Sequence, residues 1–219
     1  MYALVESGLI TKYFNKPKGF TLGDLQYPAD IFTKWSVEDK EAIGIYEVVF
    51  DDSNKKDEKW YINTNQSFTF ADGIVTASYG SATPKAHADT LYTQTEEDED
   101  VFAAGHENAG DRIGSWSAGD VKIRGLKYNL IKDLKTTVAN ELAKTDWYIT
   151  RNTEKSTSIP SSISTHRDAV RTKQAEMETA ITNASDTPAL ETLYKYVNTG
   201  TEENPVHERP LGELPTLES

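Results

Sequence analysis

The spacing of the apolar residues changes once along this chain of 219 residues, and that change limits the folds it can adopt. In the first third, polar and apolar residues alternate, as between Gln66 and Tyr79, which is typical of strands with one buried face. After Asp120, apolar residues recur every three or four positions, which is typical of α-helices. The sequence therefore predicts an α+β protein in which strands precede helices.

Residues 1–79 predict a small antiparallel β domain with one short helix. Gly8 can supply the positive φ of a tight turn between two apolar runs, which predicts an N-terminal β-hairpin. Ser36 can cap the backbone amides of a short helix, and Gly44 can end that helix. The remaining apolar segments are predicted strands, at residues 45–50, 59–63, 66–70 and 74–79.

Residues 80–119 fit neither pattern and predict an acidic, flexible linker or arm. An unbroken run of acids extends from Glu96 to Asp100, and small residues follow it, which favours a solvated chain. Four side chains are too apolar for a purely solvated tether, namely Leu91, Tyr92, Val101 and Phe102. We therefore expect parts of this segment to dock on another surface.

Residues 120–200 predict a helical domain that consists of a helical hairpin and a short third helix. The first helix is expected from about Val121 to Lys144, where the apolar stripe is continuous. Residues 146–151 interrupt that pattern, and Ile159-Pro160-Ser161 is suited to begin the second helix. Thr187-Pro188 begins the third helix, which Gly200 ends.

The second helix carries a narrow apolar stripe with polar neighbours. Its members are Ile163, Val170, Met177 and Ile181. Such a stripe suits contact with one neighbouring helix better than burial in a deep core. The sequence leaves open whether the Leu126, Leu130, Leu134 and Val138 stripe of the first helix covers it or a second subunit does.

Residues 201–219 predict an extended, Pro- and Glu-rich tail. The three prolines exclude a regular helix, and the excess of glutamates favours hydration. Ordering the backbone costs about 1–2 kcal/mol per residue. The small number of apolar side chains in the tail cannot offset this cost without a partner surface. We expect this tail to be a docking arm whose anchors are Val206, Leu211, Leu214 and Leu217.

Composition and charge exclude several classes of function. With Cys 0, disulfides, thiolate catalysis and the commonest structural zinc sites are ruled out. The net charge of −12 opposes binding to nucleic acid and to anionic lipid, and no run approaches the roughly 20 apolar residues of a membrane span. We interpret the basic stretch from Lys122 to Lys135 as the solvated face of a helix, and we expect synthesis in a cytoplasm.

No motif of known chemistry occurs in the sequence. The histidines are scattered, at His87, His106, His166 and His207, and they form no pair with metal-ligand spacing. A nucleophile elbow and a Gly-rich phosphate loop are both missing, and the acids at 96–100 lack the order of an EF-hand loop. We therefore predict no catalytic, metal-binding or cofactor-binding residue and no enzymatic activity.

Aromatic residues offer the best candidates for protein contacts. Trp60, Tyr61, Phe68, Phe70 and Tyr79 lie on predicted strands, where about half would face a core. Trp147 and Tyr148 lie between predicted helices and would be natural anchors of a protein interface.

Two parts of the chain resemble a known family. The N-terminal part comprises residues 1–8, Tyr27-Pro28 and the short helix that leads into Gly44-Ile45-Tyr46-Glu47-Val48. The C-terminal part comprises Gly125-Leu126-Lys127, Thr145-Asp146-Trp147-Tyr148-Ile149-Thr150-Arg151, Ile159-Pro160 and Arg167-Asp168-Ala169-Val170-Arg171. Together they resemble tail-fibre and fibre-assembly virion proteins of tailed bacteriophages.

The resemblance implies a structural, adaptor or assembly role in a phage tail, with no catalytic residue to carry over. Its implied partners are other tail or tail-fibre proteins, in a homo-oligomer or a multi-subunit assembly, and its implied location is the virion. Some relatives are thought of as chaperones that leave the particle, and others as resident parts. A carbohydrate-binding or depolymerising tail module is the alternative, which an aromatic platform on the β domain would favour.

Overall fold

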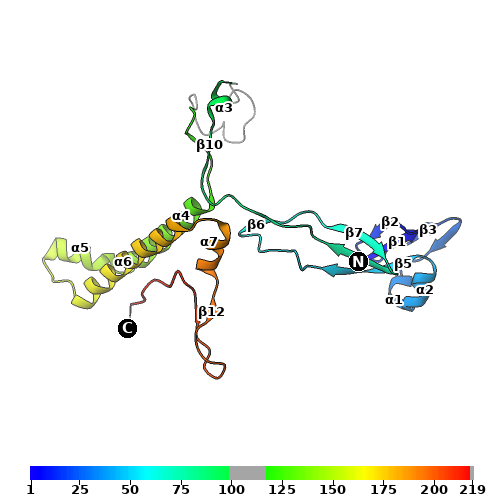
Figure 1. Cartoon of the computed structure of the whole chain (residues 1–219). Helices are drawn as coiled ribbons and strands as arrows, with labels where there is room; N and C mark the ends of the chain where they lie inside the picture. Colours follow the sequence, from blue (N-terminus) through cyan, green and yellow to red (C-terminus); the bar gives the residue numbers. More distant parts are fainter. Residues whose placement is uncertain (99–116, 218–219) are drawn as a thin grey trace. The chain divides into compact units, whose positions relative to one another are not determined.

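The computed structural model describes residues 1–98 and 117–217, and the chain divides into two compact units (Figure 1). Unit 1 spans Met1–Thr83 and unit 2 spans Pro84–Ser219. The first unit is built around a sheet and the second around helices, which confirms the predicted α+β class. The division falls at residues 83/84, within β9 (Thr83–Pro84), and not at the predicted residue 79. β9 pairs with β6 (Tyr61–Ile62).

The main sheet of unit 1 has five strands in the order β2-β1-β5-β8-β7. Their bounds are β1 (Tyr2–Glu6), β2 (Leu9–Phe14), β5 (Ile45–Asp51), β7 (Ser67–Ala71) and β8 (Ile74–Ser78). The prediction of a purely antiparallel domain is wrong at one pair, since β5 and β8 run parallel. Parallel neighbours need a long connection, and the chain between β5 and β8 supplies one that includes β6 and β7.

Two short helices, where the sequence predicts one, precede β5. The predicted helix is α2 (Val37–Ala42), and the Ser36 hydroxyl accepts a 3.1 Å hydrogen bond from the amide of Asp39, as expected of a cap. The additional helix is α1 (Ile31–Lys34), a single turn whose N-terminal residue makes no side-chain cap. A small hairpin of β3 (Phe20–Leu22) and β4 (Leu25–Tyr27) precedes them.

The apolar residues of unit 1 form two clusters. One contains Leu4, Phe14, Phe20, Ile31, Phe32 and Ile45, and therefore joins the sheet to α1. The other contains Ala3, Val5, Val48, Val75 and Ala77, with Phe68 and Phe70 packed against it. Successive residues of β1 point to opposite faces of the sheet and therefore pack in different clusters. A shift by one residue would exchange these faces, so the packing fixes the register of the central strands.

In unit 2, part of the predicted linker is ordered. β10 (Thr90–Leu91) pairs with β11 (Val121–Ile123), Tyr92 is buried, and α3 (Gln94–Asp98) follows. The described part of 80–119 is thus more ordered than a flexible linker or arm, and the burial of Tyr92 agrees with the expectation that parts of this segment dock. Val101, Phe102 and the acids Glu99 and Asp100 lie outside the described residues.

Four helices follow the β10–β11 stem. They are α4 (Leu126–Ala143), α5 (Asp146–Lys155), α6 (Ser161–Asn183) and α7 (Thr187–Tyr194). The first predicted helix starts too early, because Val121–Ile123 is a strand. Residues 146–151 do not interrupt helical structure but begin α5, whereas α6 and α7 start as predicted, next to Pro160 and at Thr187.

Part of the C-terminal segment packs into unit 2, which the sequence does not predict. β12 (Val197–Asn198) pairs with β13 (His207–Glu208), and the amide of Leu211 donates a 3.0 Å hydrogen bond to the carbonyl of Leu193 on α7. Leu211 is only 3% exposed. The expectation that 201–219 lies outside the fold is therefore wrong for this part, because the hairpin returns Leu211 to the end of α7.

Candidate protein interface

The apolar stripe of α6 is covered within the chain. Ile163, Val170, Met177 and Ile181 are all buried, and so are Leu130, Leu134 and Val138 of the adjacent α4. Contacts such as those of Lys127 with Thr182 and of Arg167 with Leu142 join the start of each helix to the end of the other, so the pair is antiparallel. We therefore correct the prediction that these four residues of α6 contact a partner protein. They pack on α4 of the same chain.

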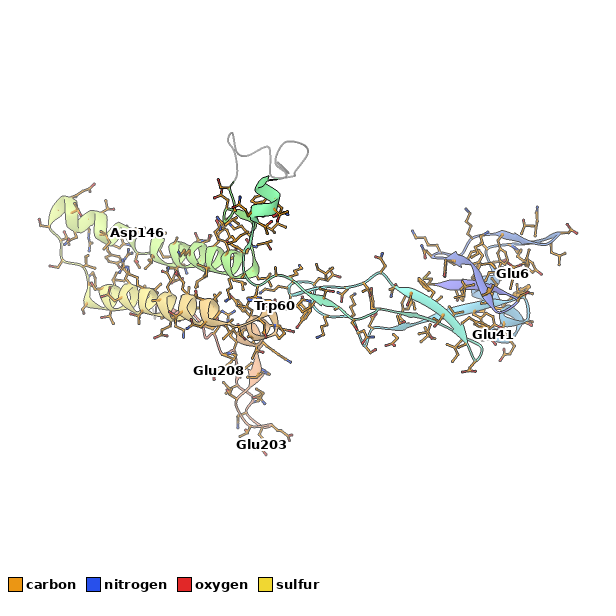
Figure 2. All side chains as sticks on the ribbon, turned by 45° about the horizontal axis from the view of Figure 1, so that its top comes forward. Glu6, Glu41, Trp60, Asp146, Glu203 and Glu208 are labelled. Atoms are coloured by element: carbon orange, nitrogen blue, oxygen red, sulfur yellow. The ribbon has the colours of Figure 1, made fainter. Side chains whose placement is uncertain are left out.

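A polar cluster lies at the end of the helical hairpin, where α4 ends and α5 begins. One terminal nitrogen of Arg167 lies 2.8 Å from the carbonyl oxygen of Leu142, 2.7 Å from the hydroxyl oxygen of Thr145 and 2.8 Å from a carboxylate oxygen of Asp146. Figure 2 labels Asp146 at this end of the hairpin. Arg167 thereby adds a charged donor to a carbonyl in the last turn of α4, which also accepts a 3.1 Å hydrogen bond from the amide of Thr145. The cluster positions α5 rather than forming a binding site.

His166 lies beside this cluster and is buried. Its Nε2 atom lies 3.4 Å from Oε1 of Glu141. The ammonium of Lys144, and secondarily His166, lower the pKa of Glu141, although burial opposes them. Glu141 of α4 and His166 of α6 face each other across the hairpin, so their contact too contributes to its packing.

An exposed aromatic cluster lies on α5, and we call Trp147, Tyr148 and Arg151 the α5 cluster. The ring centroids of Trp147 and Tyr148 are 3.8 Å apart, and the guanidinium carbon of Arg151 lies 4.7 Å from the Trp147 ring and 5.6 Å from the Tyr148 ring. Trp147 remains 51% exposed. The two rings and the guanidinium contact one another, and these contacts fix the orientation of the exposed indole.

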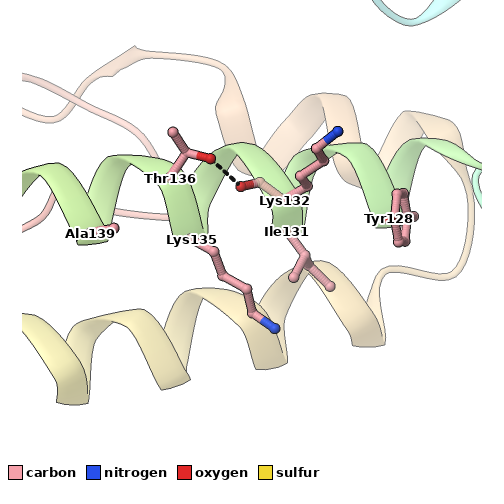
Figure 3. Close-up of a pocket in the computed structure, with 6 residues that line it drawn as sticks. All are labelled: Tyr128, Ile131, Lys132, Lys135, Thr136 and Ala139. Atoms are coloured by element: carbon pink, nitrogen blue, oxygen red, sulfur yellow. Dashed lines mark hydrogen bonds between the residues drawn. The ribbon is translucent and has the colours of Figure 1, made fainter.

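A second exposed feature is a groove along α4, which we call the α4 groove (Figure 3). Its lining residues are Tyr128, Ile131, Lys132, Lys135, Thr136 and Ala139, and its volume is about 520 Å³. The residues at 131, 135 and 139 each follow a buried residue of the hairpin by one position, which is about 100° around a helix. α4 therefore has a second, uncovered stripe next to the one that packs on α6.

The four predicted anchors of the tail differ in their surroundings. Leu211 is buried in its own unit, Leu214 is half-buried, and Val206 is exposed next to β13. Leu217, with Pro215 and Thr216, lines a shallow groove of about 460 Å³ whose other wall is the first part of α6. Leu211 is therefore a core residue and not an anchor on a partner, whereas Val206 and Leu217 remain accessible.

The sequence pattern alone does not reveal the α4 groove or Arg151. The basic composition of Lys122 to Lys135 indicates a solvated face, and in the sequence Ile131 only widens the apolar stripe of the first helix. For Arg151, the available signal is its spacing of four residues from Trp147, which places both on one face of a helix.

Residues 1–98 and 117–217 offer neither a metal centre nor a membrane span. In those residues, no group of three or more His, Asp or Glu side chains is placed to hold a metal ion. No helix in the described part of the chain is both long and apolar enough to cross a membrane.

Comparison with known proteins gave no match. The chain matches no family model, no curated protein and no solved structure.

Proposed function

We propose that the chain is a non-enzymatic structural, adaptor or assembly component of a bacteriophage tail. The observation that carries the proposal is the α5 cluster, in which a half-exposed tryptophan is held by a tyrosine and an arginine. These three residue types dominate the binding energy of protein interfaces. The phage context rests on the resemblance of residues 145–151 and their neighbours to virion proteins.

The way α5 is attached supports the same proposal. Asp146 at its start is fixed to α6 through Arg167, so the cluster is presented on a firmly held element. A preorganised surface loses less entropy when it binds. Tail components of this kind contribute surfaces to an assembly, and the chain offers such a surface on its helical unit.

Four of the aromatic residues of unit 1 favour assembly over the alternative of glycan binding, although Tyr13, Trp35 and Phe50 of the same unit are exposed. Trp60 and Tyr61 are buried, and Phe68 and Phe70 pack against the apolar cluster around Val75. A sugar-binding platform needs aromatic faces in solvent. These four rings therefore do not supply the platform that the alternative requires.

Mass spectrometry of purified virions of the encoding phage tests the proposal. We expect peptides of this chain at a fixed ratio to the tail proteins if it is a resident component. Detection only in assembly intermediates from the lysate would assign it the role of a departing chaperone. Absence from both, together with glycan binding by the purified chain, would contradict the proposal.

A further inference from the structure

The α4 groove combines an apolar floor with two lysines, Lys132 and Lys135. Ile131 and Ala139 supply apolar surface, and Tyr128 is 42% exposed at one end. Lys132 has no carboxylate partner among residues 1–98 and 117–217, and Nζ of Lys135 lies 3.8 Å from Oε2 of Glu178, a long contact. Figure 3 shows Ile131 and Lys135 leaning toward α6. The ammonium of Lys132 is thus available beside an apolar strip, and that of Lys135 is engaged only by the long contact with Glu178.

Tyr128 is held in a defined position at the end of the groove. The guanidinium carbon of Arg124 lies 4.2 Å from the centroid of the Tyr128 ring, and Arg124 is itself fixed by an ion pair of 2.6 Å with Asp89. The ring is therefore oriented before any partner arrives, which reduces the entropic cost of binding. An oriented tyrosine at the edge of an apolar strip is typical of interface anchors.

From this geometry we propose that the α4 groove binds an acidic amphipathic helix of another protein. This inference rests on the proposed function and names the chemistry of the partner. Apolar side chains of that helix pack on Ile131 and Ala139, and carboxylates on the flanking turn pair with Lys132 and Lys135. A helix fits because the small residues Thr136 and Ala139 allow its backbone to approach α4 closely, as in ridge-into-groove packing.

Charge and apolar contact decide between this occupant and others. A second copy docked groove to groove would bring Lys132 and Lys135 of both copies together, and like charges in an interface are unfavourable. A phosphate backbone offers charge but no apolar side chains to pack on Ile131 and Ala139. A carboxylate-bearing apolar helix satisfies both the local positive charge and the apolar floor.

Fluorescence anisotropy with two synthetic helical peptides tests the inference on the full chain. The peptides share one leucine stripe and differ only in bearing glutamates or lysines beside it. We expect the acidic peptide to bind about tenfold more tightly than the basic one, since two exposed ion pairs are exchanged for two repulsions. The double variant Lys132→Glu, Lys135→Glu should reverse this preference, and Lys155→Glu, an exposed control on α5, should leave it unchanged.

Because Lys135→Glu faces Glu178, Lys132→Glu alone serves as the second variant, and thermal unfolding is used to check that both variants are folded. Equal binding of the two peptides, or a preference that Lys132→Glu does not weaken, would overturn the inference. A dimer in light scattering that the double variant abolishes would assign the groove to a second copy and overturn it as well. Presence of the chain in virions is measured separately, so the inference can fail while the proposed function stands.

Discussion

Arg167 on α6 donates a buried hydrogen bond of 2.7 Å to the hydroxyl oxygen of Thr145, in the turn between α4 and α5. The Thr145 hydroxyl in turn donates to the carbonyl of Leu142 at 3.0 Å. A single side chain thus connects all three helices at the end of the hairpin. The α5 cluster depends on this connection for its position.

Replacing Arg167 should destabilise unit 2. Arg167→Ala leaves the buried Thr145 hydroxyl without its donor and the Leu142 carbonyl with only its donors from Thr145 and Lys144, which costs about 1–3 kcal/mol of unfolding free energy. The control is Arg171→Ala, because Arg171 lies on the same helix in an exposed pair with Asp168. Urea denaturation of both variants measures the difference. Equal stability of the two would show that the polar cluster contributes nothing.

Gly44 should be the more sensitive of two glycines with the same backbone conformation. Gly44 and Gly73 both have φ +78°, but a Cβ atom at Gly44 would overlap the carbonyl oxygen of Val5, whereas one at Gly73 meets nothing within 4 Å. Gly73→Ala should cost only the left-handed strain of about 1–2 kcal/mol. Gly44→Ala should cost clearly more, as measured by thermal unfolding, and an equal loss would contradict the overlap with Val5 as its cause.

The stem of unit 2 should loosen in acid through Glu96. Its hydrogen bond from the Lys122 ammonium, helped by the Thr93 amide, lowers the pKa of Glu96 from 4.5 to about 2. Because the folded pKa is depressed, the stabilisation is complete above pH 4.5 and is lost as the pH falls toward about 2. An NMR titration should find this low midpoint. A midpoint near 4.5 would contradict the ion pair. Glu96→Gln should remove this pH dependence of stability, whereas the control variant Glu154→Gln should retain it.

Truncation should separate the ordered part of the tail from its end. Removal of residues 201–219 deletes β13 and the buried Leu211, and loss of one such core side chain alone costs about 2–5 kcal/mol. Removal of residues 214–219 retains both and should cost much less. Urea denaturation distinguishes the two truncations. If the longer truncation is as stable as the full chain, the tail is a free arm, as its composition indicates.

The sequence predicts those elements whose signals are local. Pro160 and Pro188 mark helix starts, and the regular spacing of Leu130, Leu134 and Val138 identifies the α4 face that packs on α6. At residues 121–123 the pattern misleads, because a short apolar run fits a strand or a helix equally well.

Features set by distant partners could not be predicted. The parallel pairing of β5 with β8 depends on residues well separated in sequence, and the burial of Leu211 depends on Leu193 across a hairpin. Of the candidate interface, residue type alone identifies Trp147 and Tyr148. It does not identify the α4 groove, because the lysines give that stretch the composition of a solvated face.

The most direct test of the proposed role is co-sedimentation of Trp147→Ala with virions in a gradient. The matched control is Trp35→Ala, which removes a partly exposed tryptophan of unit 1. Since truncation of an interface hot spot costs at least about 2 kcal/mol, we predict that Trp147→Ala remains with the free protein while its melting temperature is unchanged. The control should sediment with the particles. Incorporation of Trp147→Ala at the level of the unmodified chain would contradict the account.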